Sequence, residues 1–337
     1  MASSELLNII ELLVFPGILF LIAYALVCEW VDRRFYARLQ NRYGPIYAGW
    51  KGILQPLADL IKLLAKEDIT PAAADRRTFF AVPLFLLALP LTIMYMIPIL
   101  GPSAYVHFEG DLILVMFFMI LLVLAVFIGG WSSVNRFSAV GGMRAALQML
   151  SYEIPLGLAA VGPAILASSV SISGIVQWQA DSLSSFLKGP TTNGVIMGAA
   201  TAAVMAIGFG IFTICMLAEL EKVPFDAPEA ETEIVSGWQA EFSGRKLALI
   251  RLGSSVKLVL ASGLLTALFL GGPIGFAPVP GAVWFIVKSL FCVLVMSNLR
   301  ALFARFRIDQ TSSWLWKSIL PLAVLYLVTI ELLAGVM

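Results

Sequence analysis

The sequence predicts an all-α polytopic membrane protein with eight transmembrane helices and both termini on the outer side of the membrane. Of its 337 residues, 60% are hydrophobic and 13% are charged, whereas a soluble domain carries about 25% charged residues. The mean hydropathy is +0.93. A helix crosses a bilayer with about 20 apolar residues. Eight segments meet this length, and they are residues 6–28, 79–100, 112–130, 150–168, 195–217, 249–270, 281–297 and 313–335. We therefore expect a single integral membrane domain over residues 1–337.

The distribution of basic residues predicts the orientation. Of the 22 Lys and Arg, 19 lie in or border the loops that follow odd-numbered spans. Lys188 is on the other side, and Lys257 and Lys288 fall inside spans. Cytoplasmic loops carry the excess of Lys and Arg in membrane proteins. The basic loops are therefore expected in the cytoplasm, in a multi-pass protein of the cell inner (plasma) membrane.

Cysteine and histidine content argues against several kinds of redox site. The three cysteines, Cys28, Cys215 and Cys292, are far apart, and no CxxC motif occurs. A cysteine-ligated iron–sulfur cluster or zinc site in this chain is therefore not expected. His107 is the single histidine, so a haem with paired histidine ligands is not expected either. We expect no metal ligand and no catalytic residue here, and any redox centre to belong to another protein.

Acidic residues concentrate in the predicted cytoplasmic loop 218–248. Seven of the 21 Asp and Glu lie between 219 and 241, interleaved with apolar residues such as Phe225 and Trp238. Two interpretations stay open. The loop is solvated, as most charged runs are, or its carboxyl groups are crowded and partly buried. In the second case acids such as Glu229 and Glu233, at i and i+4, have raised and coupled pKa values and hold protons near neutral pH.

Three ionisable residues fall inside predicted spans. Glu153 lies near the start of the fourth span, where it either marks a functional site or reaches the nearby interface. Lys288 lies in the middle of the seventh, too deep to reach water, so we expect it to face a carboxylate or a wet cavity. Lys257 is nearer the basic side, and snorkelling to the interface accounts for it.

The long basic loop 29–78 contains a predicted amphipathic helix. Apolar residues from Ile53 to Leu64 share one helical face, and Asp59, Lys62 and Lys66 share the other. Such a helix is suited to lie in the membrane interface. Four arginines before it recur at roughly helical spacing, a pattern typical of an anchor to anionic lipid. On pattern alone, this segment is either a surface anchor or part of a site.

Four sequence blocks resemble the H subunit of respiratory complex I, a family that also includes related dehydrogenase subunits and subunits of membrane-bound NiFe hydrogenases. DRRFYARLQNRYGP begins at Asp32 and is followed by GILQPLADLIKLLAKE. GGWSSVNRFSAVGGMRAALQMLSYEIP ends at Pro155. AELEKVPFDAPEAETEIVSGWQAEFSGRKLAL begins at Ala218, and RALFARFRIDQTSSWLWK begins at Arg300. The blocks run in the family's order over nearly the whole chain, and the third is the most specific.

This resemblance implies a membrane subunit that forms a quinone cavity beside the peripheral arm and couples quinone reduction to proton translocation. The implied residues of the cavity and its entrance are Asp32, Arg33, Arg34, Arg42, Asp59, Lys62, Asp226 and Glu241. The implied residues of the proton path are Glu153, Glu219, Glu229, Glu231, Glu233 and Arg144, to which we add Lys288 for its intramembrane position. Quinone or a quinone-like lipid is the implied substrate. No cofactor is expected to be covalently bound, and iron–sulfur clusters are expected only in partner subunits.

The implied partners are iron–sulfur subunits of the peripheral arm on the cytoplasmic side, other membrane-arm subunits and lipids, with no nucleic acid. The chain departs from usual complex I wording at several positions. Asp32 replaces a Glu, and Ile46 replaces an Asn after Gly-Pro. Ser254 replaces the second acid of the sixth span, and a Ser-Asn pair reads Val134-Asn135. One alternative is therefore the ion-translocating coupling subunit of a membrane-bound NiFe hydrogenase without quinone. A stand-alone secondary transporter is another, although no internal repeat is evident.

Overall fold

The computed structural model describes residues 12–188, 192–276 and 278–335. Within these ranges the chain is helical without strands, and seven helices are long and apolar enough to cross a membrane. They are Arg76–Met94 (α4), Asp111–Ser132 (α5), Arg136–Ala167 (α6), Gly198–Glu219 within α8 (Thr192–Glu219), Gly244–Phe269 (α10), Gly281–Leu302 (α11) and Ile308–Ala334 (α12 to α13). These helices coincide with the second to the eighth predicted span, so the all-helical prediction is confirmed.

The first predicted span differs from the structure. Residues 1–11, which hold its first part, lie outside the described ranges. α2 (Ile18–Leu39) continues well past the predicted end at residue 28. The added part carries Asp32, Arg33 and Arg34, so α2 is not among the seven apolar helices. A hydropathy pattern ends where charge begins, but a helix continues wherever its charged side chains find partners.

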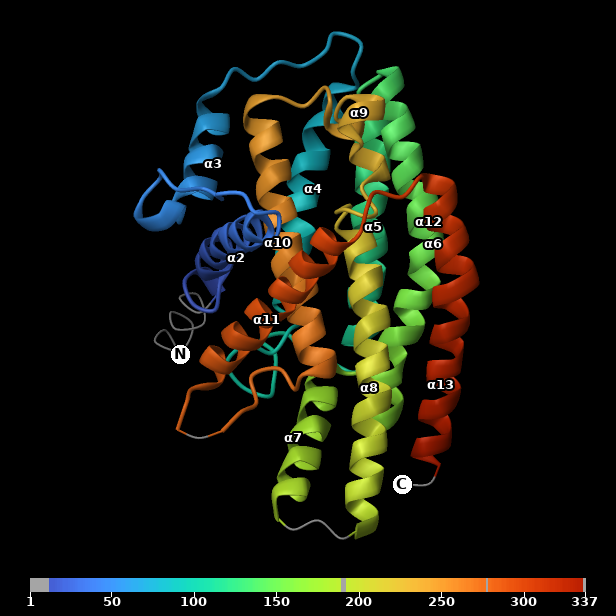
Figure 1. Cartoon of the computed structure of the whole chain (residues 1–337). Coiled ribbons are helices and arrows are strands. Elements are labelled where there is room, and N and C mark those ends of the chain that lie inside the picture. Colours follow the sequence, from blue (N-terminus) through green and yellow to red (C-terminus); the bar gives the residue numbers. More distant parts are fainter. Residues whose placement is uncertain (1–11, 189–191, 277, 336–337) are drawn as a thin grey trace.

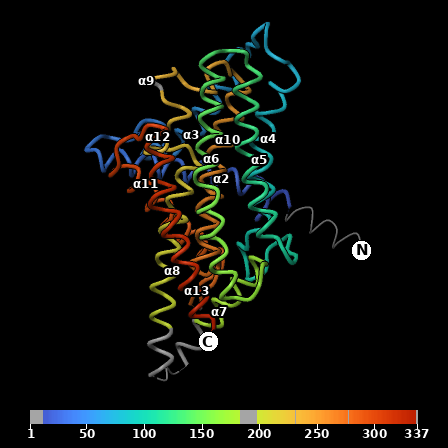
Figure 2. Tube along the Cα trace, turned by 90° about the vertical axis from the view of Figure 1, so that its right-hand side faces the viewer, coloured from blue at the N-terminus to red at the C-terminus, as the bar shows by residue number. Residues whose placement is uncertain are grey.

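α10 stands at the centre of the bundle (Figure 1). In its most apolar stretch 83% of the residues are buried, compared with 22% for the α12–α13 helix at the edge. α10 packs against α4, α8, α2 and α11. α2 and α11 cross the bundle obliquely, whereas α5, α6, α8 and α13 run along its length. α7 (Ile172–Lys188) lies at the end of the bundle opposite to α9, as Figures 1 and 2 both show.

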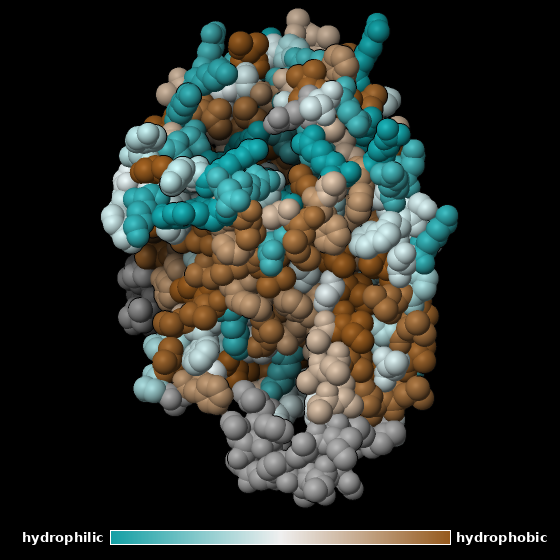
Figure 3. All heavy atoms as spheres, viewed as in Figure 1, coloured by the Kyte–Doolittle hydropathy of each residue, from teal (hydrophilic) through white to brown (hydrophobic). Residues whose placement is uncertain are grey.

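Polar and apolar surfaces separate along the bundle axis. Figure 3 shows hydrophilic side chains gathered toward the end that carries α3, above a belt of hydrophobic ones. α3 (Gln55–Ala65) is the predicted amphipathic helix, and it packs beside α2 and α10. Its apolar residues Leu57, Ile61 and Leu64 are exposed. An exposed apolar face next to a charged one suits a helix that lies at a membrane interface.

The acidic segment folds against the bundle. It consists of η2 (Ala227–Glu229), α9 (Glu231–Ile234) and η3 (Gly237–Gln239), and η3 packs on α5 and α6. The close fit depends on glycine. Gly237 has a φ of +56°, and a Cβ there would collide with the Pro228 carbonyl; a Cβ at Gly141 would collide with the backbone at Trp238. Trp238 and Phe225 are buried, so a fully solvated loop is the wrong interpretation.

Candidate functional site

A cleft lies between α2, α3 and α10, near the end of the bundle that carries α3. It has a volume of about 360 Å³. Leu26, Pro56 and Leu60 contribute to its apolar wall, and Glu29 and Arg33 contribute to its polar wall. A cavity of this size with few polar groups suits a mainly apolar ligand that carries a polar head.

Ion pairs organise the polar wall of this cleft. Arg33 Nη1 lies 2.7 Å from Asp59 Oδ2, and Nη2 binds Glu29. Gln55 Nε2 donates to Asp59 Oδ1 at 2.9 Å, and Ser255 donates to Glu29. Partial burial acts to raise the pKa of Asp59, but the hydrogen bonds from Arg33 and Gln55 outweigh it and hold that pKa below its usual value. Asp59 is therefore ionised at neutral pH.

The predicted entrance residues of α2 and the basic loop lie in different places. Those that line the cleft are Arg33, Asp59 and Lys62. Arg34 donates to the Lys51 carbonyl oxygen at 3.0 Å, and its guanidinium lies 5.3 Å from the centre of the Trp30 ring. Arg34 therefore fixes the turn that precedes α3. Arg42 is exposed on the connecting loop.

Asp32 is buried and does not line the cleft. Its Oδ2 lies 2.7 Å from Lys222 Nζ and 3.2 Å from Arg300 Nη1. Ser297 of α11 donates to its Oδ1. The carboxylate thus ties α2 to α11 and to the segment after α8, which holds both walls of the neighbouring cavity in place.

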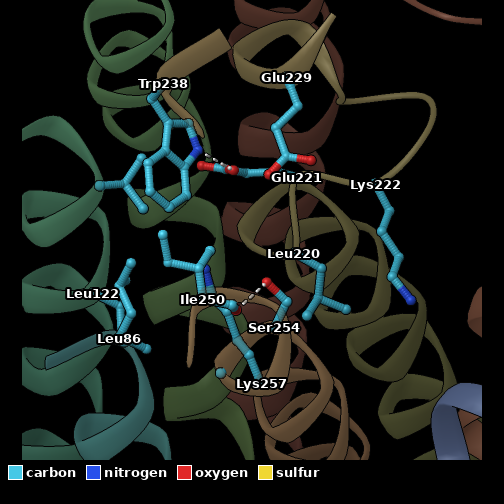
Figure 4. Close-up of a pocket in the computed structure, with 12 residues that line it drawn as sticks. Leu86, Leu122, Leu220, Glu221, Lys222, Glu229, Trp238, Ile250, Ser254 and Lys257 are labelled. Atoms are coloured by element: carbon cyan, nitrogen blue, oxygen red, sulfur yellow. Dashed lines mark hydrogen bonds between the residues drawn. The ribbon is translucent and has the colours of Figure 1, made fainter. Parts of the chain in front are cut away.

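A second cavity of about 50 Å³ lies across α10 from the cleft (Figure 4). This is room for a few water molecules. The carboxyl groups of Glu221 and Glu229 lie against each other on one side, and Trp238 Nε1 donates to Glu221 Oε2 at 3.2 Å. Ser254 and Lys257 of α10 line the other side. The cavity is therefore a polar, water-sized space between a carboxyl pair and a lysine.

Glu229 holds a proton at neutral pH. Burial raises its pKa most, the Glu221 carboxylate raises it further, and Arg251 and Lys257 lower it, which leaves the pKa at about 8. Burial also raises the pKa of Glu221. The two carboxyl groups hydrogen-bond each other, so one donates its proton to the other. Such a pair takes up or releases one proton near neutral pH.

Glu219, at the end of α8, forms a buried ion pair close to this cavity. Its Oε1 lies 2.7 Å from Lys257 Nζ, and Tyr152 donates to Oε2. The expectation that Lys257 snorkels to the interface is wrong, because its ammonium finds a carboxylate inside the protein. Glu153 lies next to Tyr152 on α6, and its Oε2 is buried without a hydrogen-bond partner among the described residues.

Two further members of the predicted proton path lie on the acidic segment. Arg144 Nη1 of α6 lies 2.6 Å from Glu233 Oε2, and that carboxylate is exposed. Glu231 lies in α9, but its side chain is outside the described part of the structure. The Arg144–Glu233 pair holds α9 to α6 and does not line either cavity.

Asp226 and Glu241 lie away from the cleft for which they were predicted. Asp226 Oδ2 lies 2.7 Å from Arg305 Nε, on the chain between α11 and α12. Glu241 accepts a hydrogen bond from Asn135 at the α5–α6 turn. Both carboxylates fasten the acidic segment to its neighbours, so the structure brings them to its edges rather than to a ligand cavity.

Lys288 lies at the opposite end of α10. Its Nζ donates to the backbone carbonyl oxygens of Leu270, Gly272 and Ile274 at 2.6, 3.1 and 2.6 Å. The ammonium thereby satisfies carbonyl groups at the C-terminal end of α10. Its partners are carbonyl groups rather than the expected carboxylate, and it does not join the acids around the cavity.

Sequence reasoning missed several charged residues that build the two cavities. They are Glu29, Glu221, Lys222 and Arg251. The i, i+4 spacing of Glu29 and Arg33 was a usable signal, because such pairs meet on one helix face. Glu221 resembled any other acid of its loop, since only the folded segment places it against Glu229. Lys222 and Arg251 carried no local signal of their partners.

The cysteines do not form a common site. All three are buried and unbridged, in α2, α8 and α11. Across the ranges that the structure describes, no group of three or more His, Cys, Asp or Glu is placed to hold a metal ion. The chemistry available in the described residues is therefore proton exchange and polar recognition.

Comparison with known proteins gives the family. The model of the NADH dehydrogenase family matches residues 11–331. The NADH-quinone oxidoreductase H subunit of Thermomicrobium roseum is 39% identical over 308 residues, which cover 88% of this chain and 87% of that protein. The chain belongs to the family of NADH-quinone oxidoreductase H subunits. The four-block resemblance is thus confirmed, and this H-type protein is a membrane subunit of the complex I type, which implies a multi-subunit complex.

Other relatives cover even more of this H-type chain. The NADH-quinone oxidoreductase H subunit of Syntrophotalea carbinolica is 37% identical over 324 residues, 93% of this chain and 91% of its own length. The second of the numbered NADH-quinone oxidoreductase H subunits of Syntrophobacter fumaroxidans is 36% identical over 331 residues, 96% of this chain and 94% of its own. The names of these relatives favour the quinone-linked hypothesis over the hydrogenase alternative.

Proposed function

We propose that this protein forms the quinone-binding cavity of a complex I-like respiratory oxidoreductase at the junction with the peripheral arm, and couples quinone reduction to proton translocation. The cleft between α2, α3 and α10 carries this proposal. Its volume of about 360 Å³ falls within the roughly 300–1,000 Å³ of ligand pockets. It combines apolar walls with an arginine that Glu29 and Asp59 hold in place.

Reduction of a quinone to a quinol takes up electrons and protons in equal number. In this proposal the electrons come from an iron–sulfur cluster in a neighbouring soluble subunit, and this chain holds no redox centre. Arg33 and Lys62 line the cleft, and their N–H groups suit the carbonyl oxygens of a quinone head. Charge that develops on the head alters the protonation of carboxyl groups nearby.

The proton path begins at the carboxyl groups that α10 separates from the cleft. Glu221 and Glu229 share a proton, and Glu219 and Glu153 extend the series of acids toward α6. Arg144, Glu231 and Glu233 lie on the acidic segment and connect the series to the cytoplasm. We leave Lys288 out of the path because three carbonyl groups hold it at the far end of α10.

The membrane arrangement is part of the same proposal. We place the loops 29–78 and 218–248 in the cytoplasm and both termini on the outer side of a cell inner membrane, with eight spans in one domain. The position of 19 of the 22 Lys and Arg on one side supports this. The exposed cytoplasmic loops would then meet the iron–sulfur subunits, and the outer helices would meet lipid and other membrane-arm subunits.

Quinone kinetics test the cleft assignment. Arg33→Met removes the fixed donor, so we expect the KM for a short-chain quinone to rise about tenfold. Electron transfer to a water-soluble acceptor that bypasses the quinone should stay unchanged. Arg136→Gln, at an exposed position at the start of α6, is the matched control. An unchanged KM in Arg33→Met would contradict the assignment.

Co-purification separates the proposal from its alternatives. A tagged chain isolated in mild detergent should bring iron–sulfur subunits and a bound quinone or quinone-like lipid, without nickel. Nickel together with the large subunit of a hydrogenase would instead assign this chain to a hydrogenase complex. A chain without partners that transports ions alone in liposomes would support a stand-alone transporter.

A further inference from the structure

One helix forms the wall between the cleft and the small cavity. Arg251, Leu252 and Ser255 of α10 line the cleft. Ile250, Gly253, Ser254 and Lys257 line the cavity. At about 100° per residue, the centres of these two sets lie roughly 150° apart around the helix axis. A charge on α10 near the border between the two faces therefore acts on both spaces.

Arg251 lies at that border. It belongs to the cleft set, while Ser254, at i+3 on the same helix and thus its neighbour on the surface, belongs to the cavity set. Both residues are exposed. Ser255 donates to the Arg251 carbonyl at 3.0 Å and to Glu29 across the cleft. The backbone at Arg251 is thus fixed, whereas its long side chain extends into the open space.

On the cleft side, the other charged groups already have partners. Arg33 binds both Glu29 and Asp59, and Lys62 and Lys66 line the same cleft from α3. Arg251 makes no ion pair with any carboxylate in the described part of the chain. Its guanidinium is therefore the cleft-facing arginine that is able to move toward an incoming anion.

On the cavity side, several groups face Glu229. Glu221 hydrogen-bonds it, Gln239 of η3 donates to it, and Lys257 faces it from α10. Lys257 is committed to Glu219 at 2.7 Å. Arg251 is the first of the two cations that oppose burial and Glu221 in setting the pKa of Glu229. The same guanidinium thus faces the cleft and acts as a counter-charge for the carboxyl pair.

We propose that Arg251 is a positioning residue that transmits charge between the cleft and the Glu221–Glu229 pair. An anionic head group in the cleft, such as a reduced quinone before it is protonated, draws the guanidinium toward itself. The carboxyl pair then loses its counter-charge and binds its shared proton more tightly. When the head group is neutralised or leaves, Arg251 returns and the pair releases a proton. No covalent step is involved, and the proton exchanges with water in the cavity.

This inference rests on the proposed function for the identity of the ligand, but its first test does not. The protonation of Glu229 is followed by infrared titration of the intact complex without added quinone, with Glu229→Gln to assign the carboxyl band. Arg251→Gln should move the midpoint to higher pH by about half a unit or more. Arg251→Lys, which keeps the charge, and Arg245→Gln, at an exposed position earlier on α10, should leave it near the native value. An unmoved midpoint in Arg251→Gln overturns the inference and leaves the quinone cleft standing.

The second test uses the native complex first. A carboxylate-bearing quinone analogue should raise the midpoint of Glu229, and a neutral analogue of equal size should have a smaller effect. Arg251→Gln should abolish the difference between the two analogues. If the difference persists in that variant, or if the anionic analogue binds natively without moving Glu229, Arg251 does not transmit the charge. Failure of both analogues to bind in the cleft would instead contradict the proposed quinone function.

Discussion

The cleft and the small cavity both contain carboxyl groups beside α10, yet these groups are in opposite protonation states. In the cleft, Asp59 faces Arg33 at 2.7 Å and has a lowered pKa. In the cavity, Glu221 and Glu229 face each other, and the pKa of Glu229 is about 8. The difference arises because the acidic segment brings two acids together while the cations around them are shared with other partners. Local counter-charge, as well as burial, therefore decides which acids hold protons.

The largest effect is expected on the cavity side, where Lys257 pairs with the buried Glu219 at 2.7 Å. Lys257→Met leaves that carboxylate buried without its cation. Removing one partner of a buried ion pair costs about 3–5 kcal/mol, so the melting temperature of the complex in detergent should fall sharply. Adding Glu219→Gln should recover part of the loss, and Lys317→Met, at an exposed position, should cause none. Equal stability of Lys257→Met and native protein would show that the pair is not buried.

The next largest effect concerns proton translocation. Glu229→Gln removes the proton-sharing partner of Glu221, and proton transfer groups contribute about 10² or more to rates. We expect pumping in vesicles to fall by about 10²-fold while the complex still assembles. Glu109→Gln, exposed on the loop before α5, is the control. Native proton pumping in Glu229→Gln vesicles would remove this acid from the path.

A smaller effect is expected in the cleft. Asp59→Asn takes one of two carboxylates from Arg33, but Glu29 still holds the guanidinium. The KM for quinone should therefore rise only about threefold, less than for Arg33→Met. Asp68→Asn, whose partner Lys246 lies at 3.0 Å outside the cleft, should leave the KM unchanged. A larger effect from Asp59 than from Arg33 would reverse the roles of the two residues.

The smallest effect is the pH dependence of stability. Glu229 has a folded-state pKa of about 8, above its ordinary 4.5, so its contribution is fully present below pH 4.5. It is lost as the pH rises to about 8, because the unfolded chain releases the proton first. Asp59 has the opposite sign, since its lowered pKa stabilises the fold at neutral pH and that contribution is lost in acid. Melting curves of Glu229→Gln should fall less steeply between these pH values than native curves, and parallel curves would exclude a protonated Glu229.

The sequence predicted the spans better than the site. The seven apolar helices were evident because a lipid-crossing helix must be apolar over its whole length. The helix α2 ran on past its predicted end because Asp32 finds Lys222 and Arg300, residues far away in the sequence. The cleft was not predictable, since α2, α3 and α10 meet only in three dimensions. For the same reason Lys257 and Lys288 received the wrong partners: neither sequence neighbourhood contains Glu219 or the end of α10.

The most direct test of quinone binding in the α2–α3–α10 cleft is photolabelling of the intact complex with a photoreactive quinone, followed by peptide mapping. A second cleft of similar volume, about 350 Å³, lies at the other end of α4 beside Tyr95 and Tyr105 and serves as an internal comparison. We predict labels on cleft residues such as Leu60 and Leu63, removed by excess natural quinone. Competable labels at Tyr95 or Tyr105 with none in the α2–α3–α10 cleft would contradict the account.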